Sequence, residues 1–371
     1  MRNARRVSRP SSGLETPIRF ASAFGILALL AGVSACGKVA HTEATAPAAT
    51  RKSPHPTSVT LLLGAVRTTR RACEERIIPK FQAEWRASHG QEVVFRQSYG
   101  DGHAQALAVM EGFEADVVIL SSDADIESLS CSGILRHDWR TAPHGGDVCY
   151  SPVIIAVRKG NPRQILDWSS LTQPGLRVVM PDPWKSEDGR MDLCAVLGAA
   201  LRGHAGFAPG DEVRARSFLI NVLSKHVGEE EDGHSSFQSF EAGTGDVAIT
   251  REMELIHGRM FGHEYESVIP SSTLRIDTSA AVLDAHVDKH GTREVAEAFL
   301  AYLFSPAAQK ALAFYGLRPV EAPTAAKCRA EYARVEDLWP IEDLPTWDVI
   351  CEEVLQAERT KGPSSPKAED K

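Results

Sequence analysis

The sequence lacks the short motifs that mark the common enzyme classes. Its 371 residues contain no Walker loop, no G-x-S-x-G turn, no H-E-x-x-H pair and no G-x-G-x-x-G loop in a credible setting. A C-x-x-C pair is also missing, which argues against a zinc ribbon. We therefore predict a protein that is not an enzyme and that holds no cofactor and no metal. An exported enzyme, for example a hydrolase or a phosphatase, is kept as a minor alternative.

The chain also lacks an excess of positive charge. It has 41 Lys and Arg against 49 Asp and Glu, and its formal net charge at neutral pH is -8. The first 35 residues hold five arginines and one acid, so removing that segment would leave a net charge of -12. Because phosphate contacts need clustered Lys and Arg, this acidic chain is not expected to bind nucleic acid.

Long apolar runs are scarce. The one run near the N-terminus, FASAFGILALLAGVSA at 20–35, is shorter than the roughly 20 residues of a membrane span but suits the core of a signal peptide. It ends in Val33-Ser34-Ala35-Cys36, which resembles the lipobox of bacterial lipoproteins. We expect a signal peptide at 1–35, lipidation of Cys36, a flexible linker at 36–57 and a periplasmic or other extracytoplasmic protein anchored to a membrane. The alternatives are a plain signal peptide and a buried helix that happens to contain a Cys.

Six cysteines remain after Cys36. An even number in an exported chain suggests disulfides, although free buried thiols are the alternative. The favoured pairs are Cys131 with Cys149, Cys328 with Cys351, and Cys73 with Cys194 as the remainder.

Strand and helix patterns alternate along the rest of the chain. The first alternation predicts strands at 59–63, 93–95 and 116–120, with helices at 68–88 and 104–112 between them. A long apolar strand at 150–157 precedes a second alternation, with strands at 177–180 and 246–250 and helices at 190–202 and 211–225. A strand at 273–283 and one amphipathic helix at 292–313 follow. This order predicts an α/β fold of two lobes, with lobe 1 at 58–150 plus 273–355, lobe 2 at 151–272 and a disordered tail at 358–371.

Several motifs in a fixed order resemble the sulfate- and thiosulfate-binding proteins of bacterial ABC importers. The similarity spans about residues 59–320 and includes Gln97-Ser98-Tyr99-Gly100, Glu114-Ala115-Asp116, Arg158-Lys159-Gly160-Asn161-Pro162, Gly245-Asp246-Val247 and Ser305-Pro306. The resemblance implies a periplasmic-binding-protein fold of type II, with a ligand cleft between the lobes. It further implies a small-molecule ligand held by hinge closure, an ABC permease as partner and a monomer.

Three loops are expected to bind an anion in such a cleft. A dehydrated oxyanion needs many donors, and helix N-termini offer free N–H groups and a positive dipole end. The loops at 68–70, 98–102 and 186–190 each join a strand to a helix, although plain helix capping is the alternative. With the resemblance, the predicted ligand-binding residues are Arg67, Thr69, Arg70, Ser98, Gly100, Asp101, Ser186, Glu187, Asp188, Gly189, Arg190 and Arg251.

The sequence departs from the family at these loops. Two family glycines are Glu187 and Asp188 here, and Arg251 stands where the family has a Trp that donates its indole N–H. Two unit charges about 4 Å apart repel by about 4 kcal/mol at an effective dielectric near 20, and a sulfate dianion doubles that cost. Such a loss would remove micromolar affinity, which is about 8 kcal/mol. We therefore expect a ligand other than plain sulfate, such as a zwitterion, an organic acid or a cation, used in transport or in sensing, unless the two acids point outward or pair with arginines.

Overall fold

A computed structural model describes residues 57–228, 232–345 and 350. The predicted signal peptide, Cys36, the disordered tail and all but the last residue of the linker lie outside these residues. The described residues all belong to one compact unit. Among the described residues, no helix is both long and apolar enough to cross a membrane.

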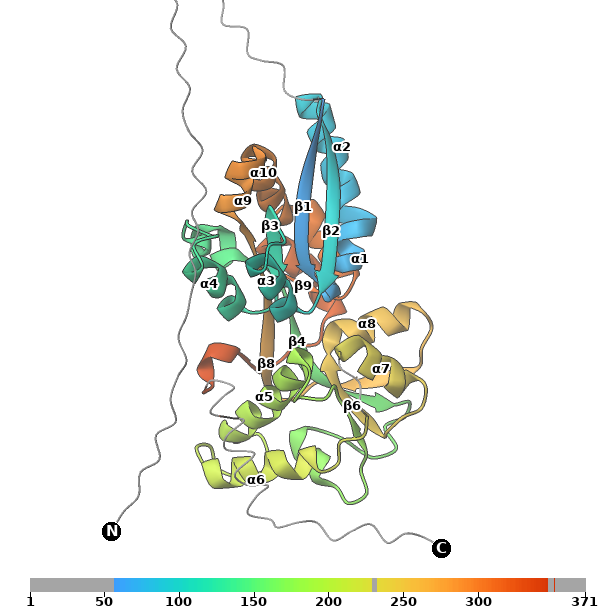
Figure 1. Cartoon of the computed structure of the whole chain (residues 1–371). Helices are drawn as coiled ribbons and strands as arrows, with labels where there is room; N and C mark the ends of the chain where they lie inside the picture. Colours follow the sequence, from blue (N-terminus) through green and yellow to red (C-terminus); the bar gives the residue numbers. More distant parts are fainter. Residues whose placement is uncertain (1–56, 229–231, 346–349, 351–371) are drawn as a thin grey trace, which may run out of the picture. The chain divides into compact units, whose positions relative to one another are not determined.

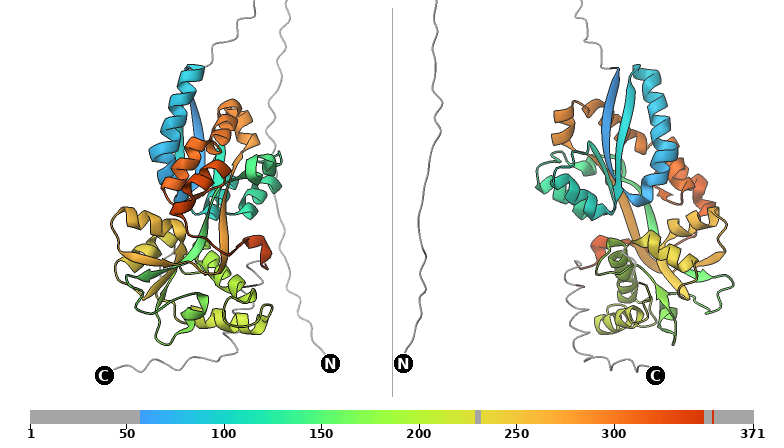
Figure 2. Two further views of the ribbon diagram at one scale, coloured as in Figure 1. Left: turned by 180° about the vertical axis from the view of Figure 1, so that it is seen from behind. Right: turned by 45° about the vertical axis from the view of Figure 1, so that its right-hand side comes forward.

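The first lobe is built on a sheet that is covered on both faces. Strand β1 (Ser58–Val66) runs parallel to β2 (Glu92–Gly100) and β3 (Val117–Leu120), and β3 pairs antiparallel with β8 (Ser272–Val282). Successive residues of β3 enter different cores, because side chains alternate across a strand. Val117 and Ile119 pack with α2 (Ile78–His89), α10 (Arg293–Leu303) and α11 (Pro306–Phe314). Val118 and Leu120 pack with α3 (Gly102–Met110) and α4 (Asp123–Cys131), and Figure 2 shows α2 and the α3–α4 pair on opposite sides of the strands.

The second lobe repeats this plan around β4 (Asp147–Arg158), β5 (Val178–Val179), β6 (Val247–Arg251) and β7 (Tyr265–Val268). Val153 and Ile155 of β4 face a core made with α5 (Glu187–Leu201) and α6 (Glu212–Leu223). Ile154 and Ala156 face the other side, where α7 (Gly233–Glu241) and α8 (Glu252–Met260) pack. The continuous apolar run at 150–157 is therefore explained by a strand that is buried on both faces.

Two crossing strands join the lobes (Figure 1). The first half of β4 pairs with β8, and its second half pairs with β6 and β7. Strand β10 (Asp337–Pro340) pairs with β8, and its Trp339 packs into the core of the second lobe. The molecule thus has the predicted two-lobed α/β architecture. The exact lobe boundaries, 58–150 with 273–355 and 151–272, stay a prediction.

Several shorter elements complete the described chain. The chain from β1 to α2 is helical throughout, through η1 (Arg67–Thr69), α1 (Arg70–Ala72) and the π-helical η2 (Cys73–Ile77). The C-terminal part of the described chain also contains α9 (Asp284–His290), β9 (Arg318–Pro319), which pairs with β4, α12 (Ala322–Cys328) and the 3-10 turns η6 (Arg329–Glu331) and η7 (Ile341–Asp343).

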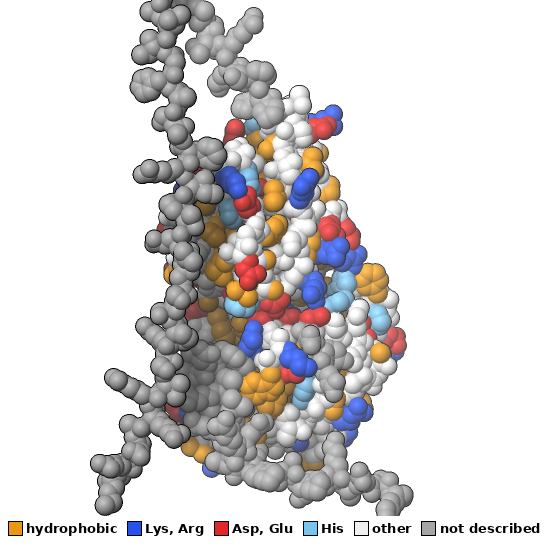
Figure 3. Space-filling model, viewed as in Figure 1, with side chains coloured by type: hydrophobic (Ala, Val, Ile, Leu, Met, Phe, Trp, Pro, Cys, Tyr) orange, Lys and Arg blue, Asp and Glu red, His pale blue; other side chains and the backbone are white. Residues whose placement is uncertain are grey.

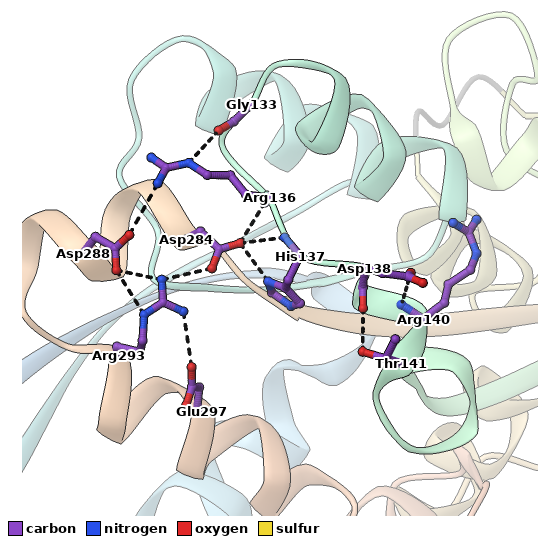
Figure 4. A network of polar contacts seen from close by, with 10 residues as sticks. All are labelled: Gly133, Arg136, His137, Asp138, Arg140, Thr141, Asp284, Asp288, Arg293 and Glu297. Atoms are coloured by element: carbon purple, nitrogen blue, oxygen red, sulfur yellow. Dashed lines mark hydrogen bonds and ion pairs between the residues drawn. The ribbon is translucent and has the colours of Figure 1, made fainter.

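A polar network ties α9 and α10 to the loop that follows α4 (Figure 4). The Asp284 carboxylate accepts hydrogen bonds from the backbone N–H groups of Arg136 (2.7 Å) and His137 (3.1 Å) and contacts the His137 ring. It also pairs with Arg293, whose Nη2 lies 2.9 Å away. Although desolvation opposes it, these contacts hold the pKa of Asp284 well below its usual range.

Two predictions about local structure were wrong. The single helix expected at 292–313 is two helices, because Pro306 has no N–H to continue the ladder and the Ser305 hydroxyl caps α11 by accepting from Ala308 N (3.3 Å). The Cys131–Cys149 and Cys73–Cys194 disulfides do not form, and all five described cysteines are free thiols.

The reason for the missing disulfides lies in where the thiols are buried. Cys73 and Cys149 belong to the core of the first lobe, Cys194 belongs to the core of the second, and Cys131 is exposed at the end of α4. Burial raises the pKa of Cys73 and of Cys194 to about 12, so both stay neutral and unreactive at neutral pH. Cys328 is a free thiol, and its expected partner Cys351 lies outside the described residues.

Candidate functional site

A cavity of about 440 Å³ lies where the carboxyl ends of strands from both lobes meet. Its lining includes Val66, Gly100 and Ser121, which end or directly follow β1, β2 and β3. From the second lobe it includes Arg251 at the end of β6. This is the position at which open α/β sheets bind ligands. In Figure 3, acidic, basic and His side chains gather in the middle of the visible face, between the first lobe above and the second lobe below.

Several helices begin at this cavity, and three of them, α3, α5 and α7, have a start that is capped by a polar side chain. Asp101 caps α3 by accepting from Ala104 N (3.3 Å), and Asp232 caps α7 by accepting from Ser235 N (2.9 Å). Ser186 caps α5, with its hydroxyl 3.5 Å from Gly189 N. The first N–H groups of a helix have no acceptor within the helix, so three positive helix ends face one space from two lobes.

The carboxylate of Glu187 reaches across the cavity from the second lobe to the first. Its Oε1 accepts a hydrogen bond from Ser121 Oγ (3.1 Å), and its Oε2 lies 3.4 Å from the backbone N–H of His103 in the first turn of α3. Only 6% of the residue is exposed. Burial raises the pKa of Glu187 to about 7, and the nearby carboxylates of Asp101 and Asp188 act in the same direction, whereas Arg251 opposes them.

The carboxylate of Asp188 occupies a second helix start. It accepts from the N–H of Gly233, the first residue of α7, at 2.9 Å, and it is paired with the Arg251 guanidinium. Burial disfavours the charge on Arg251, but Asp188 and Glu187 outweigh this effect, so the pKa of Arg251 is raised. Glu187 and Asp188, which stand where the resemblance implies glycines, therefore line the cavity instead of pointing outward.

Other charged residues of the lining are paired as well. Arg67 Nη1 lies 3.0 Å from Asp232 Oδ2 and joins the two lobes, while His234 Nδ1 lies 3.0 Å from Glu254 Oε2. The hydrogen bond with Glu254 raises the pKa of His234. The cavity thus combines cationic and acidic groups. Its charged and titratable lining residues are Arg67, Arg70, Arg71, Arg251, His234, His257, Asp101, Asp232, Glu187, Asp188, Glu254 and Tyr315.

Seven of the twelve residues predicted to bind ligand line this cavity: Arg67, Arg70, Gly100, Asp101, Glu187, Asp188 and Arg251. Their contact with a ligand stays a prediction. The other five predicted residues, Thr69, Ser98, Ser186, Gly189 and Arg190, are outside the lining.

Besides Ser186, which caps α5, the residues Thr69, Ser98 and Gly189 make contacts that hold their own loops in place. The Thr69 hydroxyl is buried and donates to Val66 O (2.9 Å), and the Ser98 hydroxyl accepts from Gln105 Nε2 (3.1 Å). Gly189 packs so tightly that a Cβ there would lie 2.5 Å from Pro181 O. Among these positions, the plain helix capping that the sequence left open as the alternative is seen at Ser186, which caps α5.

Sequence reasoning missed several lining residues, among them Ser121, Asp232, His234 and Glu254. Ser121 directly follows the strand expected at 116–120, so its place at a carboxyl strand end was a usable signal. The α7 residues gave no such signal, because the sequence pattern did not predict that helix.

The chain is similar to known proteins of one family. The family described as "Bacterial extracellular solute-binding protein" matches residues 62–318. The sulfate-binding protein of Synechococcus elongatus is 35% identical over 297 residues, covering 80% of this chain and 83% of the relative. The sulfate-binding protein of Escherichia coli is 35% identical over 272 residues, with 72% and 81% covered, and the thiosulfate-binding protein of Pseudomonas aeruginosa is 33% identical over 264 residues, with 70% and 78% covered.

Solved structures agree on the fold. The sulfate-binding protein SubI from Mycobacterium tuberculosis H37Rv superposes with a TM-score of 0.67 at 29% identity, covering 80% of this chain and 99% of that one. A periplasmic thiamin-binding protein has a TM-score of 0.61 at 16% identity, covering 82% and 96%, and this likeness concerns the fold alone.

Proposed function

Since the chain belongs to the bacterial extracellular solute-binding proteins, we propose that it is the lipid-anchored receptor of an ABC importer for a small oxyanion. The two lobes would close around the anion as they rotate about the crossing strands β4 and β8. The chain would act as a monomer that delivers its ligand to an ABC permease. It is a binding protein and not an enzyme, as are the relatives that it matches.

The observation that carries this proposal is the convergence of three helix starts and several arginines on one cavity. The starts of α3, α5 and α7 lie around about 440 Å³ of space, together with Arg67, Arg70 and Arg251. Backbone N–H groups and guanidinium groups are the donors that a dehydrated oxyanion needs. The curated relatives named for sulfate and thiosulfate support the same ligand class.

The lipid anchor is proposed from the sequence alone. The lipobox-like Val33-Ser34-Ala35-Cys36 follows a basic start and an apolar run. Each CH₂ of an attached lipid that enters the bilayer adds about 0.8 kcal/mol of binding free energy, so a diacylated Cys36 would keep the domain on the membrane. The anchor would hold the receptor near its permease.

One observation favours a second candidate ligand class. Glu187 and Asp188 are acceptors inside the cavity, and an acceptor is best satisfied by a ligand that brings a donor of its own. A zwitterion or a hydroxylated organic acid has such donors in addition to an anionic group. This candidate keeps the receptor role, in transport or in sensing, and changes only the solute.

A thermal-shift screen of the purified protein tests the proposal. The ligands are sulfate, thiosulfate, molybdate and phosphate on one side, and amino acids, hydroxy acids and polyamines on the other. A ligand present at 100 times its dissociation constant should add about 2.7 kcal/mol of stability. Stabilisation by an inorganic oxyanion supports the first candidate. Stabilisation by members of the other set alone would contradict it and select the second.

A further inference from the structure

Glu187 occupies the place at which the first lobe would hold an anion. Its carboxylate accepts from Ser121 Oγ at 3.1 Å, and the N–H of His103 at the start of α3 is 3.4 Å away. A Cβ added to Gly102 would lie 3.3 Å from Glu187 Oε2, which shows how closely the carboxylate approaches this helix start. An ionised carboxylate can only accept hydrogen bonds, so it and a fully ionised oxyanion would compete for the same donors.

The charges that face Glu187 are mostly negative. Asp101 lies on the loop before α3, Asp125 on α4 and Asp188 beside Glu187 on α5, and all three disfavour a charge on Glu187. Arg251 from β6 is the opposing cation among the described groups that act on Glu187, and it is already paired with Asp188. The His103 ring is paired with Asp125 at 2.9 Å. An additional dianion beside an ionised Glu187 would therefore meet an excess of like charge.

We propose that this cleft binds its oxyanion together with one proton, which is held in a hydrogen bond between Glu187 and the anion. The inference rests on the proposed function, since it requires an oxyanion in the cleft. It makes Glu187 a specificity-determining residue. Without the shared proton, two acceptors would face each other across the contact.

The proton can come from either side of this contact. When Glu187 is protonated, its O–H donates to an oxygen of an unprotonated anion such as sulfate, and the complex has taken one proton from solvent. When the anion carries its own proton, as hydrogen phosphate does, the anion's O–H donates to the ionised carboxylate and no proton is taken up. The number of protons in the contact is one in both cases.

The environment of Glu187 allows its carboxyl group to gain or lose a proton near neutral pH. Its pKa, raised to about 7 chiefly by burial, lies within the range in which an exported protein works. Above pH 7 an increasing fraction of Glu187 is ionised in the free protein, so sulfate binding must recruit the proton. The affinity for sulfate should then fall by roughly tenfold per pH unit, as linkage requires for the uptake of one proton.

Calorimetric titration of the purified full-length chain at pH 6, 7, 8 and 9 tests this inference. Runs in buffers of different ionisation enthalpy count the protons taken up. We expect the dissociation constant for sulfate to rise toward tenfold per unit above pH 7, with uptake of one proton. For hydrogen phosphate we expect a much flatter pH dependence.

Three substitutions test whether the proton belongs to Glu187. Glu187→Gln keeps the shape and always carries an N–H donor, so sulfate binding should lose its pH dependence and its proton uptake. Asp232→Asn is the matched control: it removes one cavity carboxylate that the Ser235 N–H helps keep ionised, and the pH slope should remain. Ser121→Ala removes the hydroxyl that donates to Glu187, so the slope should persist with its midpoint at higher pH.

Different results would contradict the shared proton and the proposed function. If sulfate binds wild type with a dissociation constant that does not change between pH 6 and 9, the shared proton is overturned while the proposed function stands. If the slope survives in Glu187→Gln and disappears in His234→Gln, the proton belongs to His234 and the inference is wrong. If neither sulfate nor phosphate binds wild type or Glu187→Gln at any pH, the proposed function fails and the inference fails with it.

Discussion

At the scale of single residues, the structure shows where the two acids of the cavity's α5 loop point. The resemblance implies glycines where this chain has Glu187 and Asp188, and the sequence alone left the direction of both side chains open. The structure directs both into the cavity, one onto the start of α3 and the other onto the start of α7. A sequence fixes which residue occupies a loop position, but a rotamer depends on neighbours such as Ser121, Gly233 and Arg251, which come from other strands and helices.

Arg251 is the residue whose loss should disturb the site most. It is 9% exposed, and its positive charge faces both Glu187 and Asp188. Arg251→Gln should weaken oxyanion binding by at least 100-fold, because it removes a donor and leaves two acids uncompensated. It should also lower the free energy of unfolding by about 3–5 kcal/mol, the usual cost of breaking a buried ion pair. Calorimetry and urea denaturation measure the two effects.

The control for this substitution is Arg251→Lys. Lys keeps the positive charge but lacks the planar fork, so it should recover most of the stability and only part of the affinity. An Arg251→Gln protein with the stability and the affinity of wild type would contradict the role of Arg251 as the counter-charge.

At the scale of helices and strands, the sequence predicted most of the regular elements near the site. The strands at 59–63, 93–95 and 116–120 are β1, β2 and β3, because apolar runs flanked by polar turns are a clear pattern. The helices and strands that were not predicted have weaker sequence patterns. Strand β10 has four residues, and it is held by pairing with β8 and by Trp339, neither of which is visible from the local sequence.

The Trp339 contact predicts an unusual response to a glycine substitution. Gly198 lies inside α5, where Ala would normally stabilise a helix by up to about 1 kcal/mol. Here an added Cβ would lie 2.1 Å from an atom of the Trp339 ring. Gly198→Ala should therefore destabilise the protein by about 1–3 kcal/mol through overpacking, as measured by chemical denaturation.

A double-mutant cycle identifies the contact responsible. In a Trp339→Leu background the space next to Gly198 is larger, so the same Ala should no longer be destabilising. If Gly198→Ala stabilises the otherwise unchanged protein, the packing of β10 against α5 is not as described.

The Asp284 network in Figure 4 predicts a contribution to stability that depends on pH. The pKa of Asp284 is lowered in the folded protein by hydrogen bonds from Arg136, His137 and Arg293. Its contribution is therefore fully present above the pKa of the unfolded chain, about 4, and is lost as the pH falls through the lower folded value. Asp284→Asn should lower the free energy of unfolding by about 2–3 kcal/mol at pH 7, and the difference from wild type should shrink below pH 4.

Asp288→Asn provides the comparison. Asp288 belongs to the same network, but half of its side chain is exposed, and its partners Arg136 and Arg293 remain solvated. Its loss should cost less than about 1 kcal/mol. Equal effects of the two substitutions at pH 7 would show that burial of Asp284 adds nothing.

At the scale of the whole molecule, the ordered motifs predicted the two-lobed architecture correctly. Motifs such as Arg158-Lys159-Gly160-Asn161-Pro162 encode scaffold turns, and a scaffold survives when ligand loops diverge. The disulfide pairs predicted among the described cysteines were wrong. Spacing along the chain suggested Cys131 with Cys149, yet one thiol is exposed at the end of α4 and the other is buried on β4. Pairing depends on distance in space, which the two-lobed fold sets and the spacing does not.

If helix starts from both lobes hold one buried oxyanion, binding should protect their backbone N–H groups. Amide hydrogen exchange with and without a saturating oxyanion from the screen measures this protection. We expect slower exchange at 102–104 in the first lobe and at both 187–189 and 233–235 in the second, with little change on the far side of either lobe. Binding that slows exchange in only one lobe, or at none of these helix starts, would contradict it.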